Sequence, residues 1–221
     1  MANDILLERL ANLDSCAISD ALDSLQLQGV VTRVKSVTVS KKIFGRAVTV
    51  KLVPKGSLQT NRHLGTAAVE SASKGDIIVI EHCSTEVAGW GGNLGIAAHL
   101  REIGGVVIDG ACRDADELTM IGFPVYARSV VPTTARGRIV EQSFNEVIAI
   151  DKVKVRPGDL VLADGSGVVF IPIEHAEAVI KVAEGIVENE AAMAKAILAG
   201  KPVSQVMGQK YETMLEIRAE K

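Results

Sequence analysis

"WGGNLGIAAHLREIGGVVIDGACRD", residues 90–114, carries the strongest indication of how this chain folds. An apolar segment at 76–82 precedes it and predicts a buried strand. A glycine-rich loop at 89–93, a helix at 94–103 and a second buried strand at 105–109 follow. Strand, loop, helix and strand in this order are typical of an α/β fold.

This order is also found in dinucleotide-binding units, but the glycine spacing differs. After Gly89 and Gly91, the third glycine of that fingerprint would fall at Leu94, and the loop begins well beyond the strand. The backbone N–H groups of residues 92–95 can still receive an anion such as a carboxylate at the start of the helix. A loop that needs glycine only for its turn explains the same spacing equally well.

Four charged residues follow the second strand: Arg113, Asp114, Asp116 and Glu117. If a helix opens at Asp114, this residue and Glu117 lie about 60° apart around the axis, so both carboxylates reach one point and Asp116 points elsewhere. Two such carboxylates suit Mg²⁺ or Mn²⁺, and Arg113 offers a planar cation for a carboxylate or a developing oxyanion. The alternative is an acidic helix start with Arg113 in a surface ion pair.

Composition sets the class of protein. A chain of 221 residues is long enough for one large domain. It is 48% hydrophobic but only 3% aromatic, so Val, Ile, Leu and Ala must build the core, as in parallel or mixed sheets covered by helices. The net charge of −3 and the few aromatic residues argue against direct binding of nucleic acid. We interpret the basic stretch at 33–46 as a solvated strand face rather than an anion-binding patch.

The chain has no apolar run near the ~20 residues that span a bilayer, and its N-terminus lacks the pattern of a secretory signal. Cys16, Cys83 and Cys112 are too widely spaced for a disulfide framework. We therefore expect a cytoplasmic protein with reduced thiols, and no membrane partner. Cys112 is interpreted as a core residue rather than a nucleophile. The four histidines lack metal-ligand spacing, and only His63 is kept as a candidate for lining a site.

Further elements are predicted on both sides of the central segment. Short helices are expected at 3–14 and 19–25, the second with Ser19 as its N-cap. A strand is expected at 45–53 and a hairpin at 159–173, in which "DGSG" supplies the turn.

A long helix is predicted after Pro172, running to about Ala199. Glu190 falls on its apolar stripe, where a buried carboxylate would need a partner. A salt bridge or a solvated stripe edge explains it as well as a site role does. The stripe consists of Val179, Ala183, Ile186, Val187, Met193 and Ile197.

The segment 90–114 resembles the RraA-like family, which includes the regulator of ribonuclease activity A and the class II 4-hydroxy-4-methyl-2-oxoglutarate aldolases. The resemblance extends over nearly the whole chain, through "ISDAL" (18–22), "GRAVTV" (45–50), "PGDLVLADGSGVVFIP" (157–172) and "ENEAAM" (188–193). It implies a single domain over residues 1–221 with a β/β/α swivelling-domain (phosphohistidine-domain-like) fold and flanking N- and C-terminal helices. It also implies a homotrimer, sometimes paired into a hexamer, with sites at the subunit boundaries.

The resemblance implies a role for each site residue. A 2-oxo acid would bind through its carboxylate to the loop amides, and Arg113 would stabilise the enolate. Asp114 would bind a divalent metal, Mg²⁺ or Mn²⁺, directly. Glu117, and Glu190 of a neighbouring subunit, would support this metal through water. The loop amides are those of Gly92, Asn93, Leu94 and Gly95.

Two functions follow from these expectations. The first is a metal-dependent lyase that releases pyruvate from 4-hydroxy-4-methyl-2-oxoglutarate-type substrates and decarboxylates oxaloacetate. The second is a non-catalytic trimeric regulator that binds and inhibits a ribonuclease. Retention of Arg113, Asp114 and Glu117 favours the enzyme. Gly92 favours the regulator, because the active aldolases carry an acid at this position.

Overall fold

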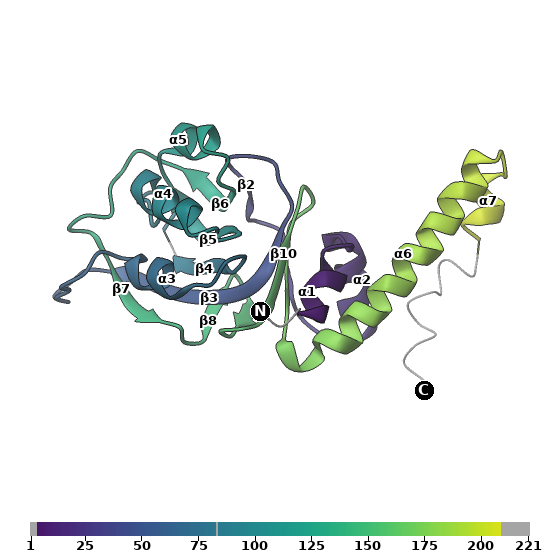
Figure 1. Cartoon of the computed structure of the whole chain (residues 1–221), viewed down its shortest axis with the longest axis horizontal. Coiled ribbons are helices and arrows are strands. Elements are labelled where there is room, and N and C mark those ends of the chain that lie inside the picture. The colour runs from purple at the N-terminus through teal and green to yellow at the C-terminus, as the bar shows by residue number, and fades with distance from the viewer. Residues whose placement is uncertain (1–3, 83, 209–221) are drawn as a thin grey trace.

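The computed structural model describes residues 4–82 and 84–208, and Figure 1 shows a mixed sheet flanked by helices. The elements in chain order are α1 (Ile5–Leu10), α2 (Ser15–Ser24), β1 (Val30–Val31), β2 (Lys35–Ser36), β3 (Ile43–Pro54), α3 (Thr66–Ser71), β4 (Ile77–His82), α4 (Gly92–Leu100), β5 (Gly105–Cys112), α5 (Ala115–Met120), β6 (Val125–Val130), β7 (Ile139–Phe144), β8 (Ile148–Ile150), β9 (Val153–Val155), β10 (Leu160–Ala163), β11 (Val168–Ile171), the 3₁₀ turn η1 (Ile173–His175), α6 (Ala176–Leu198) and α7 (Val203–Val206).

Four parallel strands, β3, β4, β5 and β6, form the middle of the sheet. Antiparallel strands extend it on both sides, in the order β1-β11-β10-β3-β4-β5-β6-β2, and β7 also pairs with β3. Every residue of β4 and β5 is buried, which explains why their sequences are apolar runs without alternation. The prediction of a parallel or mixed sheet covered by helices is confirmed.

The two faces of the central strands enter different hydrophobic clusters. Ile80 and Ile108 face α3, α4 and α5, whereas Val79 and Val107 face the β8–β9 hairpin and the β10–β11 hairpin. A third cluster joins α1, α2 and α6 to the outer side of β10 and β11. In Figure 1 these three helices lie together beyond β10, away from α4 and α5.

The first two helices differ from the prediction. Two short helices are confirmed, but the bounds of the first and the N-cap at Ser19 are wrong, because α1 ends at Leu10 and α2 begins at Ser15. The carboxylate of Asp14 accepts a hydrogen bond from the Ala17 N–H (2.9 Å) and so caps α2, which leaves Ser19 inside this helix. The predicted 159–173 hairpin is confirmed, with Leu160 paired to Ile171 and Ala163 to Val168.

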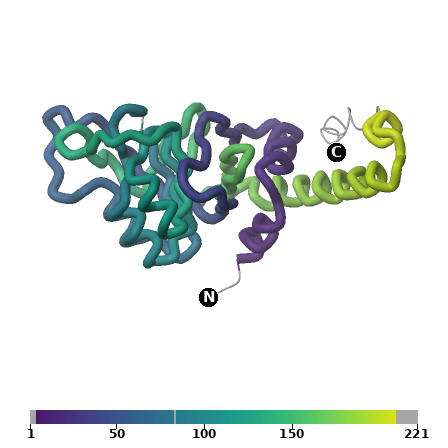
Figure 2. Tube along the Cα trace, turned by 90° about the horizontal axis from the view of Figure 1, so that it is seen from above, coloured from purple at the N-terminus to yellow at the C-terminus, as the bar shows by residue number. Residues whose placement is uncertain are grey.

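The long helix α6 is covered along only part of its length. Val179, Ala183 and Ile186 are buried, but Ile197 is 37% exposed and Glu190 is exposed. Figures 1 and 2 show the C-terminal half of α6 extending away from the sheet. Within one chain, Glu190 therefore lies on a solvated part of the stripe. None of the helices in the described part combines the length and apolar character needed to cross a lipid bilayer.

Replacing Gly110 with alanine is expected to lower the free energy of unfolding by about 2 kcal/mol, the usual cost of overpacking. A Cβ at Gly110 would overlap the carbonyl oxygen of His82 and lie 2.7 Å from that of Ser84, and both are backbone atoms that cannot turn aside. Urea unfolding measures the difference. Gly165→Ala is the matched control because nothing lies within 4 Å of its Cβ. Equal midpoints for the two variants would contradict this account.

Candidate active site

The glycine-rich loop lies beside the end of β5. The Gly89 N–H donates to the Ala111 carbonyl (2.8 Å), and the Arg113 N–H donates to the Trp90 carbonyl (3.0 Å). The carboxyl ends of parallel strands meet at one edge of a sheet, where α/β proteins bind their ligands. These bonds therefore bring the start of α4 next to Arg113 and Asp114 at that edge.

Gly91 and Gly92 leave room for two acidic side chains. Neither has a positive φ. A Cβ on Gly91 would lie 2.9 Å from Asp114 Oδ2, and a Cβ on Gly92 would overlap the Glu117 carboxylate. A requirement of the loop for its turn alone, the alternative left open by the spacing, does not account for these two positions, where the absence of a side chain lets the acids approach the helix start.

The first turn of α4 begins at Gly92, two residues earlier than predicted. Gly95 N–H donates to the Gly91 carbonyl (3.0 Å), and Gly92 N–H donates to Asp114 Oδ2 (2.9 Å). Among the described residues, the amides of Asn93 and Leu94 have no hydrogen-bond acceptor. Because the first amides of a helix lack intrahelical partners, these two can receive an anion. Two of the four predicted amides are thus available and two are occupied.

Asp114 has an unusual backbone. It has φ 58° and ψ 36°, the left-handed region, which aspartate and asparagine tolerate better than most residues. Its side chain does not cap α5; Oδ2 instead accepts from Gly92 N–H and from Arg113 Nε (3.1 Å). The left-handed turn therefore directs the carboxylate toward the start of α4.

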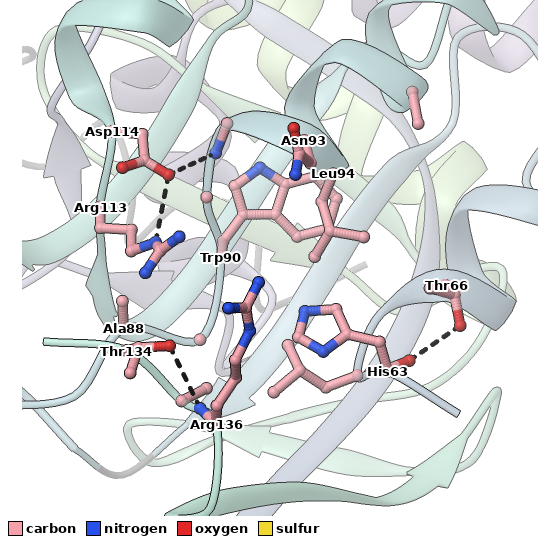
Figure 3. A pocket seen from close by; sticks show the side chains of 16 residues that line it. His63, Thr66, Ala88, Trp90, Asn93, Leu94, Arg113, Asp114, Thr134 and Arg136 are labelled. Carbon is pink, nitrogen blue, oxygen red and sulfur yellow. Dashed lines mark hydrogen bonds and ion pairs between the residues drawn. The ribbon is translucent and has the colours of Figure 1, made fainter. Parts of the chain in front are cut away.

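A cavity of about 340 Å³ opens in front of these groups. Figure 3 shows Arg113 and Asp114 on one side, Arg136 and His63 on the other, and Trp90 and Asn93 between them. Burial first, and then the positive charges of Arg136 and Arg113, lower the pKa of His63, so this imidazole stays neutral at pH 7. The cavity thus combines two guanidinium groups with one carboxylate and suits an anionic small molecule.

Glu117 and Asp116 are both exposed on α5. Glu117 lies against Gly92: a Cβ built there would be 3.2 Å from Glu117 Cδ and 3.4 Å from Asp114 Cβ. The carboxyl groups of Asp114 and Glu117 therefore flank the same glycine. Neither Glu117 nor Asp116 lines the cavity that Arg113 lines, and both line a second hollow together with Asp114. The Glu117 carboxylate occupies the volume that a side chain at position 92 would need.

The residues present fit a divalent cation that keeps most of its water. Mg²⁺ is commonly held by one or two carboxylates together with water and substrate oxygens, and Asp114 and Glu117 offer such a pair. No cluster of three or more His, Cys, Asp or Glu residues suited to a metal occurs within residues 4–82 and 84–208. Glu190 of the same chain is exposed on α6, and Figure 1 shows the C-terminal half of this helix extending away from α4 and α5. Its predicted role concerns a neighbouring subunit and stays a prediction.

Arg136 and Trp90 line the cavity but were not predicted as site residues. Arg136 lies in the loop between β6 and β7, "TTARGR" (133–138), where no periodicity or spacing indicates a site. Trp90 is inside the quoted segment, yet a buried tryptophan is usually a core residue. Only the folded arrangement brings Arg136 opposite Arg113.

Two other predictions concern side chains near the site. Cys112 is buried and unpaired, and burial raises the pKa of its thiol to about 11, so it is a core residue and no activated nucleophile. His82 is buried, and its Nε2 lies 2.6 Å from the Val87 carbonyl, a structural contact. Cys16 is free and exposed, and Cys83 lies outside the described residues.

The fold belongs to the α/β class that the sequence predicted. It has a mixed sheet, with additional helices near the N- and C-terminal ends of the described chain. The family model of the RraA-like proteins, described as Aldolase/RraA, matches residues 15–170. The chain belongs to the RraA-like family.

The similar proteins include one that is named as an aldolase. The chain is 31% identical over 188 residues to a Halalkalibacterium halodurans protein named "Putative 4-hydroxy-4-methyl-2-oxoglutarate aldolase", which covers 84% of this chain and 85% of that protein. It is 28% identical over 201 residues to protein DlpA of Legionella pneumophila, covering 90% of this chain but only 33% of that longer protein. A solved structure of an uncharacterized Pseudomonas syringae protein is 27% identical, with a TM-score of 0.82 over 92% of this chain and 96% of that one.

Proposed function

We propose that this protein is a divalent-metal-dependent lyase of small 2-oxo acids. Its reactions would be retro-aldol cleavage of 4-hydroxy-4-methyl-2-oxoglutarate-type substrates and decarboxylation of oxaloacetate, and both release pyruvate. One observation carries the proposal: the Arg113–Asp114 ion pair lies directly at the first turn of α4, whose Asn93 and Leu94 amides are free among the described residues. A structural helix start has no need for this combination.

Substrate binding begins with the carboxylate next to the 2-oxo group. The Asn93 and Leu94 N–H groups can donate to this carboxylate, and the positive end of the α4 dipole favours its charge. A carboxylate held there lies beside Arg113, which lines the same cavity. This orientation presents the 2-oxo oxygen to the guanidinium.

Both reactions break the bond between C3 and C4 of the substrate and leave its electrons on the 2-oxo group as an enolate. In the retro-aldol reaction the 4-hydroxyl loses a proton and C4 becomes a carbonyl, whereas in decarboxylation C4 leaves as CO₂. Protonation of the enolate at C3 then gives pyruvate. Arg113 stabilises the negative oxygen as it develops, and neither reaction needs a covalent lysine. A bound Mg²⁺ or Mn²⁺ would supply a Lewis acid for the same oxygen. Asp114 would hold this metal directly, and Glu117 and Glu190 of a neighbouring subunit would hold it through water.

Pyruvate release from oxaloacetate is expected to require Mg²⁺ or Mn²⁺ and to fall to the protein-free rate in EDTA. The physical reason is that the enolate charge is only partly compensated by Arg113. A coupled assay for pyruvate measures the rate, with protein-free blanks at the same metal concentration because the metal alone promotes decarboxylation. Excess Mg²⁺ should restore the rate. Absence of metal-dependent activity on 4-hydroxy-4-methyl-2-oxoglutarate and oxaloacetate would contradict the proposal.

The second candidate is a regulator that binds a ribonuclease without catalysis. Gly92 favours it, because the chain has no acid at this position, and the family description includes RraA as well as aldolases. Inhibition of a purified ribonuclease by a chain that releases no pyruvate would favour this reading. In either case we propose a homo-oligomer, trimer or hexamer, that makes no direct contact with nucleic acid. The cytoplasmic location stays a prediction.

A further inference from the structure

The cavity has a cationic end that the proposed chemistry does not use. Arg113 is paired with Asp114, but the guanidinium of Arg136 has no carboxylate or carbonyl partner among the described residues. Two nearby arginines differ from it: Arg62, which lines an adjoining hollow, pairs with Glu141, and Arg138 in the same loop donates to the Thr134 carbonyl (3.2 Å). An unpaired guanidinium facing a cavity is typical of a position that binds an anion.

The backbone around Arg136 holds the side chain at the cavity. Ala135 is buried in the hydrophobic cluster under the helices, and its carbonyl accepts from the N–H groups of Arg138 and Ile139 (both 2.9 Å). The Arg136 N–H donates to Thr134 Oγ1 (3.3 Å). Figure 3 shows the Arg136 side chain extending toward Trp90, with His63 beside it and Arg113 across the cavity. The loop therefore presents Arg136 from a fixed turn.

The charges at this end of the cavity are positive. Both Arg136 and Arg113 act on His63, which places this imidazole within the field of the two cations. Arg136 and His63 also line an adjoining hollow of about 170 Å³, together with Lys55 and Arg62. Asp114 is the only acidic side chain that lines the main cavity in the described part of the chain, and it lies at the Arg113 end.

Both proposed substrates are 2-oxo dicarboxylic acids, and we infer that Arg136, with His63 beside it, is the residue that binds their second carboxylate and so disfavours 2-oxo monocarboxylic acids. The inference rests on the proposed function, because it takes the first carboxylate to bind at Asn93 and Leu94. A monocarboxylate would leave Arg136 without a counter-charge. A cavity of about 340 Å³ lies at the small end of ligand sites and fits a short diacid.

A matched pair of unreactive probes tests this selection. 2-Oxoglutarate and 2-oxopentanoate have the same carbon chain and differ only in the terminal carboxylate. By calorimetry with Mg²⁺, the full chain should bind 2-oxoglutarate about ten- to a hundredfold more tightly, the usual effect of a charge-assisted hydrogen bond. Arg136→Ala should remove this preference, and Arg136→Lys should keep part of it. Arg138→Ala, the matched control two residues away, should keep all of it.

The outcomes separate the inference from the function on which it rests. If wild-type protein binds both probes equally, or if Arg136→Ala keeps the preference, the inference is wrong and the 2-oxo acid site stands. If wild-type protein binds neither probe, the proposed function itself fails, and the inference with it. If inorganic phosphate displaces 2-oxoglutarate from wild-type protein but not from Arg136→Ala, and Arg136→Ala still prefers 2-oxoglutarate to 2-oxopentanoate, the position binds phosphate and the carboxylate assignment is overturned.

Kinetics add a readout that a merely structural role would not give. In retro-aldol cleavage the distal carboxylate keeps its charge, so Arg136→Ala should mainly raise KM. In decarboxylation of oxaloacetate that carboxylate loses its charge as CO₂ forms, so binding it tightly stabilises the ground state more than the transition state. For oxaloacetate we expect Arg136→Ala to raise KM about tenfold while kcat rises. A fall of kcat in proportion to kcat/KM would overturn the assignment.

Discussion

Pyruvate release by an Arg113→Ala variant is expected to fall at least about a hundredfold in kcat, the loss seen when one oxyanion donor is removed from a site. Arg113 lines the cavity beside the free amides of α4, and its side chain is 35% exposed, so it can reach a bound oxo acid. The charge it would stabilise exists only as the enolate forms, and therefore the loss should fall on kcat more than on KM. Steady-state assays with oxaloacetate and with the retro-aldol substrate measure it.

Two comparisons distinguish a loss of catalysis in Arg113→Ala from a folding defect. Arg113→Lys keeps the charge but loses the planar fork, so it should retain a fraction of the activity. Arg113→Ala should still bind Mg²⁺, because Asp114 and Glu117 remain. Wild-type kcat in Arg113→Ala would remove Arg113 from the mechanism.

The parts of the fold that the sequence predicted are those in which local pattern and burial agree. β4 and β5 are apolar throughout because both of their faces are covered, and the turn residues of "DGSG" fit the β10–β11 hairpin. The cap of α2 was predicted wrongly because Asp14 and Ser19 are both good N-cap residues, and only packing selects between them. Local preferences alone did not determine this boundary.

The site was predictable only in part, for a similar reason. Arg113, Asp114 and the start of α4 lie in one continuous segment, so the sequence could group them. The approach of Glu117 to Gly92 depends on how α5 packs beside α4, and the position of Arg136 depends on a loop that follows β6. Neither the contact between Glu117 and Gly92 nor the position of Arg136 follows from a periodic pattern of residues in the sequence. The sequence shows only that position 92 lacks an acid. The structure adds that a side chain at this position would displace the Glu117 carboxylate.

Asp114→Asn should abolish metal-dependent activity and weaken Mg²⁺ binding by at least about a hundredfold, since even indirect metal partners are worth ten- to a hundredfold. Asparagine tolerates the left-handed backbone at φ 58°, and its amide oxygen can still accept from Gly92 N–H, so the fold should be retained and only the charge lost. Titration calorimetry with Mg²⁺ gives a readout that does not depend on turnover, and thermal unfolding checks the fold. Asp116→Asn is the matched control, because Asp116 is an exposed carboxylate two residues further along and, unlike Asp114, accepts no hydrogen bond from Gly92 or Arg113 among the described residues. Equal Mg²⁺ affinity in wild type and Asp114→Asn would show that Asp114 is no ligand, whereas an equal loss in Asp116→Asn would reduce the effect to the general negative charge of α5. Loss confined to Asp114→Asn would mean that the left-handed turn after β5 serves to direct one carboxylate toward the metal.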